Sequence, residues 1–277
     1  MDGTRTLHVP DGSGRLLGWR TVGEGPPLLL VNGYAATAAD WDPGFLGGLS
    51  HSRTVLLPDN RGMGASTAGD LEGMTVDSLA ADLGLLLDHL GIDRLPVAGW
   101  SMGGMTAQEF AARSPDRVAA LVLLSTDAGG SSAVRAPTAI WERLVDHTGP
   151  PREQATRLLS LLFPPEVAAD VDRLFGDAVA DARAGLSPDV LDAQERALEA
   201  WHGDGTGGPS PLTGTRPPVL VVTGTEDQVI PPANARQLAE RWGTDRVERF
   251  EGAGHAVMAQ EPVALGALVT GFLDGHR

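Results

Sequence analysis

Seven short apolar runs, each bounded by turn-forming residues, limit the possible folds of this chain more than any other feature. Such runs are typical of buried strands, whereas longer segments with apolar residues at every third or fourth position are typical of helices. The runs cover residues 16–22, 28–31, 54–57, 95–98, 118–124, 219–223 and 247–250. Helical patterns lie between several of these runs. This alternation predicts an α/β fold whose mostly parallel sheet is covered by helices on both faces.

Local signals refine this prediction at three places. The clearest helical pattern extends over residues 75–90, with Thr75 as a plausible N-cap and Gly91 directly after the last turn. The first two apolar runs have no helix between them, which predicts an antiparallel start to the sheet. After residue 128 the alternation stops, and no good strand pattern returns until about residue 219.

The segment without strands is predicted to form a helical cap inserted into the α/β core. Its helical patterns cover residues 139–147, 152–162, 166–184 and 189–201. We therefore expect a core formed by residues 1–128 and 213–277, and a cap formed by residues 129–212. A chain of 277 residues is long enough for one large domain with such an insertion.

Composition excludes several kinds of chemistry. The chain has no cysteine and no lysine, since all 21 basic residues are arginine. Disulfides, thiolate nucleophiles, cysteine-bound zinc, a pyridoxal Schiff base and a P-loop lysine are therefore excluded. The net charge of −15 argues against a nucleic-acid partner. No apolar run reaches the ~18 residues of a membrane span, and residues 1–5 carry no apolar stretch of a secretory signal. We therefore expect a cytoplasmic protein without a membrane partner.

Polar residues follow several predicted strands, and three of them suggest nucleophilic catalysis. Ser101 lies within Gly99-Trp100-Ser101-Met102-Gly103, directly after the run 95–98 and before a helical pattern. Asp227 and His255 follow the last two runs. Because the carboxyl ends of parallel strands meet at one edge of a sheet, these side chains are expected to converge there. A serine, an acid and a histidine in this order fit hydroxyl activation by a histidine base that the acid orients.

Two aspartates are candidates for the acid. Asp127 also follows a predicted strand and is an alternative to Asp227. The local sequence favours Asp227, and the neighbouring Glu226 is expected to be a solvated side chain.

Four segments together resemble the α/β-hydrolase family. Residues 99–103 resemble its nucleophile elbow, residues 224–231 its acid turn, residues 252–255 its histidine loop, and residues 59–66 the turn after its fourth strand. The resemblance covers nearly the whole chain and implies an eight-stranded, mostly parallel sheet with a helical cap. It also implies that the backbone N–H groups of Tyr34 and Met102 form the oxyanion hole. Asn32 stands where the family often has histidine, and we expect it to order this loop.

These observations predict a cofactor-independent serine hydrolase. Its expected substrate is a small to medium, largely apolar carboxylic ester or lactone, cleaved through an acyl-enzyme. Trp100 and the ring of Tyr34 are candidate substrate contacts. No metal site is expected, and the predicted partner is a small molecule. The sequence is compatible with a homo-oligomer.

Three other functions are compatible with the same scaffold. They are a cofactor-free haloperoxidase or perhydrolase, a carbon–carbon bond hydrolase, and a non-catalytic binding protein. The serine at the elbow disfavours epoxide hydrolases and haloalkane dehalogenases, because those enzymes use a carboxylate nucleophile there.

Overall fold

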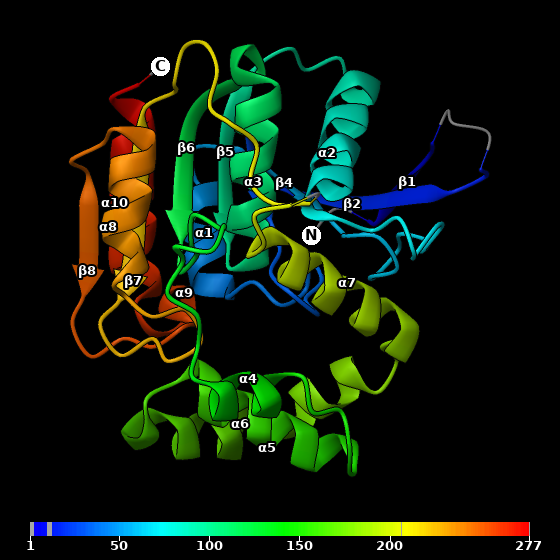
Figure 1. Cartoon of the computed structure of the whole chain (residues 1–277). Coiled ribbons are helices and arrows are strands. Elements are labelled where there is room, and N and C mark those ends of the chain that lie inside the picture. Colours follow the sequence, from blue (N-terminus) through cyan, green and yellow to red (C-terminus); the bar gives the residue numbers. More distant parts are fainter. Residues whose placement is uncertain (1–2, 10–12, 206, 277) are drawn as a thin grey trace.

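An eight-stranded sheet forms the centre of the molecule in the computed structural model, which describes residues 3–9, 13–205 and 207–276 (Figure 1). The strands follow the order β1-β2-β4-β3-β5-β6-β7-β8 across the sheet. They are β1 (Arg5–His8), β2 (Leu16–Val22), β3 (Pro27–Val31), β4 (Thr54–Pro58), β5 (Leu95–Trp100), β6 (Val118–Leu124), β7 (Val219–Gly224) and β8 (Val247–Phe250). All seven predicted strands are present.

The pairing of the strands corrects one detail of the predicted antiparallel start. Strand β2 does run antiparallel to the rest of the sheet, but its neighbour is β4. Strand β3 lies between β4 and β5 and is parallel to both. Strand β1 pairs with β2 and was missed because its four residues are mostly exposed and form no apolar run.

Helices connect the strands and flank the sheet. They are α1 (Pro43–Ser50), α2 (Val76–Leu90), α3 (Met102–Arg113), α4 (Thr138–Leu144), α5 (Pro151–Leu162), α6 (Pro165–Arg183), α7 (Pro188–Trp201), α8 (Asn234–Trp242), α9 (Val257–Gln260) and α10 (Pro262–Asp274), with a 3₁₀ turn at Pro115–Arg117. None of the described helices is long and apolar enough to cross a membrane.

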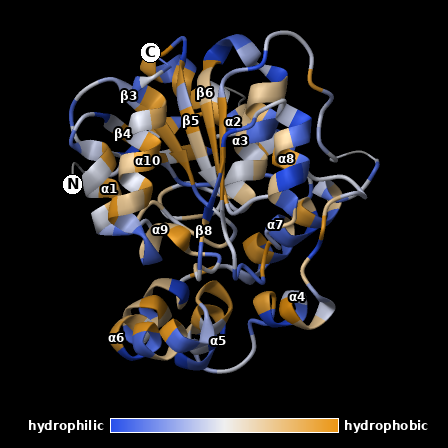
Figure 2. Cartoon of the chain, turned by 90° about the vertical axis from the view of Figure 1, so that its left-hand side faces the viewer, coloured by the Kyte–Doolittle hydropathy of each residue, from blue (hydrophilic) through white to orange (hydrophobic). Residues whose placement is uncertain are grey.

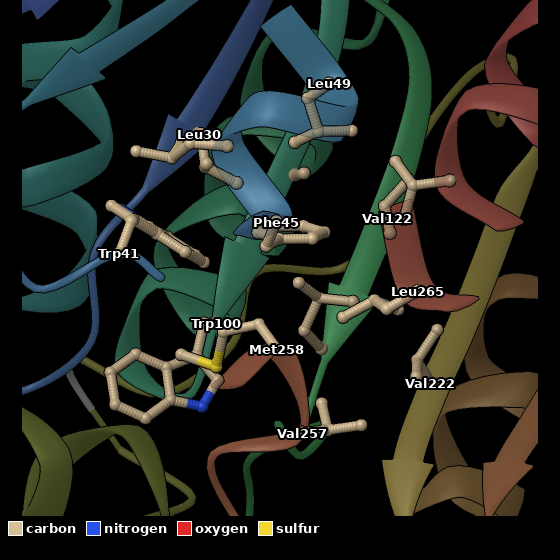
Figure 3. Close-up of a cluster of buried hydrophobic side chains, with 14 of the residues drawn as sticks. Leu30, Trp41, Phe45, Leu49, Trp100, Val122, Val222, Val257, Met258 and Leu265 are labelled. Carbon is tan, nitrogen blue, oxygen red and sulfur yellow. The ribbon is translucent and has the colours of Figure 1, made fainter. Parts of the chain in front are cut away.

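Alternating side chains along the strands form two apolar layers, one on each face of the sheet. Leu28 and Leu30 of β3 pack in one cluster with Phe45 of α1 and Leu265 of α10 (Figure 3). The intervening Leu29 packs in the other cluster, which includes side chains of α2, α3 and α8. Because successive strand residues point to opposite faces, a strand that is apolar throughout must be covered on both sides. The predicted arrangement of helices on both faces is confirmed.

Helix α2 begins and ends where its sequence predicts. The Thr75 hydroxyl oxygen accepts a hydrogen bond from the Ser78 N–H, and the Ser78 hydroxyl oxygen accepts one from the Thr75 N–H. Gly91 follows the helix with a φ of 65°, a left-handed conformation that glycine adopts without steric cost.

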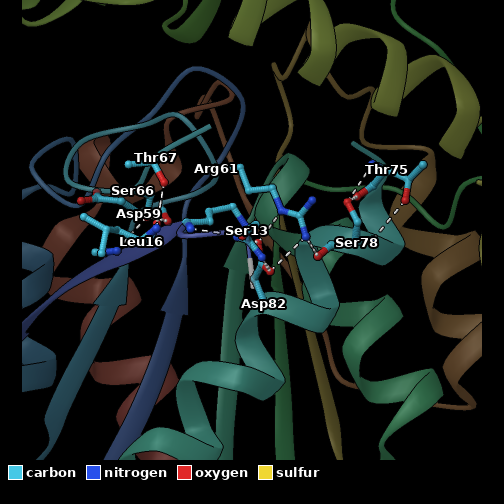
Figure 4. A network of polar contacts seen from close by, with 11 residues as sticks. Ser13, Leu16, Asp59, Arg61, Ser66, Thr67, Thr75, Ser78 and Asp82 are labelled. Carbon is cyan, nitrogen blue, oxygen red and sulfur yellow. Dashed lines mark hydrogen bonds and ion pairs between the residues drawn. The ribbon is translucent and has the colours of Figure 1, made fainter. Parts of the chain in front are cut away.

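A buried carboxylate on α2 joins this helix to the turn after β4. Asp82 accepts hydrogen bonds from both Arg15 and Arg61, with N–O distances between 2.6 and 3.0 Å (Figure 4). Arg61 also donates to the Ser78 carbonyl. Arg61 therefore has a structural role, because hydrogen bonds between oppositely charged groups are stronger than those between neutral groups.

Replacement of Asp82 by alanine is expected to lower the free energy of unfolding by about 3–5 kcal/mol, because two buried guanidinium groups would lose their carboxylate. Chemical denaturation followed by circular dichroism measures this loss. Asp77→Ala on the same helix is the control. Asp77 pairs with Arg113, and both side chains are more than a third exposed, so this change should cost about 1 kcal/mol or less. Equal losses in the two variants would contradict the prediction.

Helices α4 to α7 occupy the segment between β6 and β7. In Figure 1 the carboxyl ends of β5 and β6 point toward α4, α5 and α6, and the perpendicular view of Figure 2 places these three helices at the same end of the molecule. Helix α7 contacts α2 of the core. All four helices lie within residues 129–212. The division of the chain into a core and a cap at these boundaries stays a prediction.

Candidate active site

A sharp turn between β5 and α3 presents Ser101. The residue has a φ of 55° and a ψ of −124°, a conformation that residues other than glycine seldom adopt. Hydrogen bonds hold it on both sides of its α-carbon: its N–H donates to the Leu124 carbonyl over 3.0 Å, and its carbonyl accepts from the Thr126 hydroxyl over 2.8 Å. Strand β6 and the residues directly after it thus fix the turn that carries the serine.

The glycines around Ser101 are required by close contacts. A Cβ atom on Gly99 would lie 2.2 Å from the Gly103 carbonyl oxygen, and one on Gly103 would lie 2.2 Å from the Val31 carbonyl oxygen. Neither distance can be relieved by rotating a side chain, because the atoms contacted belong to the backbone. The close packing of strand against helix therefore requires small residues on both sides of the serine.

His255 and Asp227 form a buried pair. The Nδ1 atom of His255 lies 2.8 Å from Oδ2 of Asp227, and the two residues are 2% and 3% exposed. The other carboxylate oxygen accepts the N–H groups of Val229 and Ile230 over 2.9 and 2.8 Å. Because an ionised carboxylate only accepts hydrogen bonds, the histidine must donate from Nδ1, which leaves Nε2 free to take a proton.

Trp100 connects this pair to the elbow. Its Nε1–H donates to the His255 carbonyl over 2.9 Å, and the centroids of the two rings are 5.2 Å apart. The residue next to the serine therefore fixes the histidine loop. Trp100 also packs against Trp41 in the apolar cluster around α1.

The alternative acid, Asp127, is bound to a different histidine. Its Oδ2 lies 2.9 Å from Nε2 of His202, while Oδ1 accepts from the Gly129 N–H and the Trp201 Nε1–H. The geometry thus favours Asp227 as the carboxylate that serves His255. Glu226 is exposed, as a solvated neighbour would be.

The backbone N–H groups of Tyr34 and Met102 are the predicted oxyanion donors. Within the described residues, no hydrogen bond uses the N–H of Tyr34 or of Met102. Asn32 orders the loop that carries Tyr34, because it donates to the Pro58 carbonyl over 2.8 Å and accepts from the Trp41 indole N–H. The substitution of asparagine for the histidine common at this position therefore leaves the loop held by side-chain hydrogen bonds.

A cavity of about 320 Å³ opens beside Ser101. Most of its wall is apolar, with polar groups in a minority. The lining residues are Tyr34, Ser101, Met105, Asp127, Val134, Arg135, Ala136, Thr138, Trp141, Leu144, Leu198, His202, Val229 and Ile230. Its size and mostly apolar wall fit a small organic ligand. No cluster of histidine and carboxylate side chains that could hold a metal ion occurs in the described part of the chain.

The two candidate substrate contacts, Tyr34 and Trp100, differ in their position relative to the cavity. Tyr34 is part of the cavity wall, whereas Trp100 is not among the lining residues. A direct role of Trp100 in substrate binding therefore has no support from the cavity, since its indole is committed to His255 and Trp41. His202 lies within the segment predicted to form the cap. Nothing in its local sequence marks it, because its partner Asp127 is 75 positions away along the chain.

Comparisons with known proteins identify the family of this chain. Residues 26–151 match the family model described as alpha/beta hydrolase fold, and residues 194–276 match the one described as TAP-like protein. RutD of Caulobacter sp. (strain K31), which carries the name of a carbamate hydrolase, is 28% identical over 249 residues, 90% of this chain and 91% of the relative. A non-heme chloroperoxidase of Streptomyces lividans is 26% identical over 90% of this chain and 92% of its own length.

The solved structures lead to the same family. The crystal structure of the enol-lactonase from Burkholderia xenovorans LB400 superposes with a TM-score of 0.79 at 26% identity, covering 98% of this chain and 100% of that protein. The strand order, the turn at Ser101, and these matches together show that the chain belongs to the α/β-hydrolase superfamily.

Proposed function

We propose that this α/β-hydrolase is a serine hydrolase that cleaves a small to medium, largely apolar carboxylic ester or lactone through an acyl-enzyme. The observation that carries the proposal is the position of Ser101 in the wall of a mostly apolar cavity. Its neighbour Trp100 is hydrogen-bonded to the carbonyl of His255, and His255 is paired with Asp227. The name of the Burkholderia enol-lactonase is consistent with this substrate class, because a lactone is a cyclic ester.

In the first half of the proposed reaction, the Ser101 hydroxyl oxygen bonds to the substrate carbonyl carbon while Nε2 of His255 takes the hydroxyl proton. Asp227 stabilises the imidazolium that forms. The N–H groups of Tyr34 and Met102 donate to the negatively charged oxygen of the tetrahedral intermediate, a contribution of about 3 kcal/mol for each donor. His255 then gives its proton to the leaving alkoxide oxygen, and the carbon–oxygen bond of the ester breaks.

In the second half, water attacks the acyl-enzyme and His255 takes a proton from it. The tetrahedral intermediate collapses, the serine oxygen leaves with the proton, and the carboxylic acid is released. The acyl group is expected to lie among the apolar side chains of the cavity, such as Leu144, Leu198 and Ile230.

A series of 4-nitrophenyl esters tests this proposal. We expect kcat/KM to be highest for medium acyl chains such as hexanoate and about tenfold or more lower for palmitate, because a cavity of 320 Å³ lies at the small end of ligand sites. Release of nitrophenolate measures the rate, and heat-unfolded protein is the control. Hydrolysis that the unfolded protein matches would contradict the proposal.

A second activity needs an assay of its own, because the chain is 26% identical to the Streptomyces lividans chloroperoxidase. Hydrogen peroxide could replace water as the group that attacks an acyl-enzyme, which would form a peracid. Peroxide-dependent bromination in acetate buffer, absent in phosphate buffer, measures that reaction. A bromination rate above the rate of ester hydrolysis would make perhydrolysis the main activity.

A further inference from the structure

The loop that carries Tyr34 is strained and needs support from outside its own residues. Ala35 has a φ of 54°, in the left-handed region that disfavours residues with a Cβ atom. The peptide bond that joins Tyr34 to Ala35 directly follows the Tyr34 N–H, which is the proposed oxyanion donor. A shift of this peptide would therefore turn the donor away from the position of the oxyanion.

Two adjacent side chains of α7 hold this loop. Gln194, which is fully buried, accepts the Ala35 N–H on Oε1 over 2.9 Å. Glu195 accepts the Tyr34 hydroxyl on Oε1 over 2.5 Å. Successive residues of the helix thus bind successive residues of the loop, although 159 or more positions separate them along the chain.

A third group completes the contact. Nε2 of His147 lies 3.0 Å from the Tyr34 hydroxyl oxygen and 3.0 Å from Oε1 of Glu195. The Glu195 carboxylate cannot donate a hydrogen bond, and the Tyr34 hydroxyl already donates one to it. The hydrogen bond between His147 and Glu195 must therefore use a hydrogen on Nε2 of His147. Burial, followed by the hydrogen bond to Glu195, raises the pKa of Tyr34 far above its usual range, so the phenol stays a donor.

On the other side, the loop rests against the nucleophile elbow. A Cβ atom on Gly33 would lie 2.9 Å from the Trp100 ring and 3.3 Å from the Ser101 Cβ. The loop is therefore confined between the elbow and α7, which runs between the sheet and helices α4 to α6 (Figure 1).

We propose that α7 fixes the reactive geometry of the oxyanion loop, with Gln194 and Glu195 as positioning residues for the Tyr34 N–H. The inference rests on the proposed function, because it assigns the helix a role in stabilising the same oxyanion. It links specificity to catalysis, since α7 also contributes Leu198 to the cavity wall.

The test compares variants that remove or keep the acceptor atoms. Gln194→Met and Glu195→Met preserve side-chain length without an oxygen, whereas Glu195→Gln keeps an acceptor for the Tyr34 hydroxyl. We expect kcat for 4-nitrophenyl hexanoate to fall about 10- to 100-fold in each methionine variant with KM changed less than threefold, because a displaced donor acts in the transition state. The rate of labelling by a fluorophosphonate should fall in parallel. Glu195→Gln should recover most of kcat.

Arg196→Gln is the matched control, since this residue of α7 is exposed and its guanidinium donates to the Leu71 carbonyl and not to the Tyr34 loop. Thermal unfolding of every variant separates positioning from folding. Methionine variants that unfold earlier but keep wild-type kcat while folded would overturn the inference. If Glu195→Met does not fold, Tyr34→Phe removes the same hydrogen bond and keeps the backbone N–H, and its kcat decides. A wild-type protein that hydrolyses no ester would instead overturn the proposed function, and this inference with it.

Discussion

Replacement of Ser101 by alanine is expected to lower kcat for ester hydrolysis by about 10⁴-fold or more, because no acyl-enzyme can form without the hydroxyl oxygen. The fold should survive this change. Alanine is smaller than serine at the same backbone conformation, and the Ser101 side chain lies at the wall of the cavity. Burst kinetics with a 4-nitrophenyl ester, together with mass spectrometry after exposure to a fluorophosphonate, measure the loss of acylation.

Ser125 provides a matched control for this experiment. It follows the neighbouring strand β6, has a positive φ of 43°, and its buried hydroxyl has no hydrogen-bond partner in the described structure. Ser125→Ala should therefore keep wild-type kcat and wild-type labelling. Retained hydrolysis and labelling in Ser101→Ala would remove the serine mechanism. A wild-type protein that takes up no fluorophosphonate would favour a non-catalytic binding protein.

Replacement of Asp227 by asparagine is expected to lower kcat by about 10⁴-fold, because the amide cannot stabilise the imidazolium of His255 and can itself donate to Nδ1. The latter contact would favour the tautomer that carries its hydrogen on Nε2, which cannot accept the serine proton. Packing should change little, since the two side chains have the same shape. The pH dependence of kcat/KM and the thermal midpoint, measured together, distinguish loss of the base from loss of the fold.

Asp127→Asn is the control that decides between the two candidate acids. Asp127 binds Gly129, Trp201 and His202 and has no hydrogen bond to His255. We therefore expect a loss of stability of about 1–3 kcal/mol, from weakened hydrogen bonds to a buried carboxylate, with kcat reduced less than about tenfold. A larger fall in kcat in Asp127→Asn than in Asp227→Asn would reverse the assignment.

Seven of the strands, together with the approximate limits of α2 and of α4 to α7, could be predicted because their signals are local. Apolar runs and three- to four-residue periodicity depend on neighbours within a few turns of chain. The four helical patterns of the cap segment correspond to α4 through α7 with shifts of a few residues. The pairing of β2 with β4 instead of β3 could not be predicted in this way, because it depends on contacts between residues far apart in the sequence.

In the candidate site, too, some residues carry a local sequence signal and others do not. The candidates Ser101, Asp227 and His255 could be proposed from the sequence because a parallel sheet brings the ends of its strands to one edge. Gln194 and Glu195 carry no such signal, since a glutamine and a glutamate on an amphipathic helix are typical of a solvated face. Trp100 was expected at the substrate because it adjoins the serine, yet its indole packs into the core.

The alternation of strands and helices, the glycine-flanked turn around Ser101 and the order of the three polar residues after the strands can all be read from the amino-acid sequence. These features are encoded by composition and spacing within short segments. The pairing of Asp227 with His255, that of Asp127 with His202, and the contact of α7 with the loop of Tyr34 are visible only in the folded structure. Each of these choices depends on the packing of segments 28 to 161 positions apart, whose relative placement is fixed only when the whole sheet and its covering helices assemble.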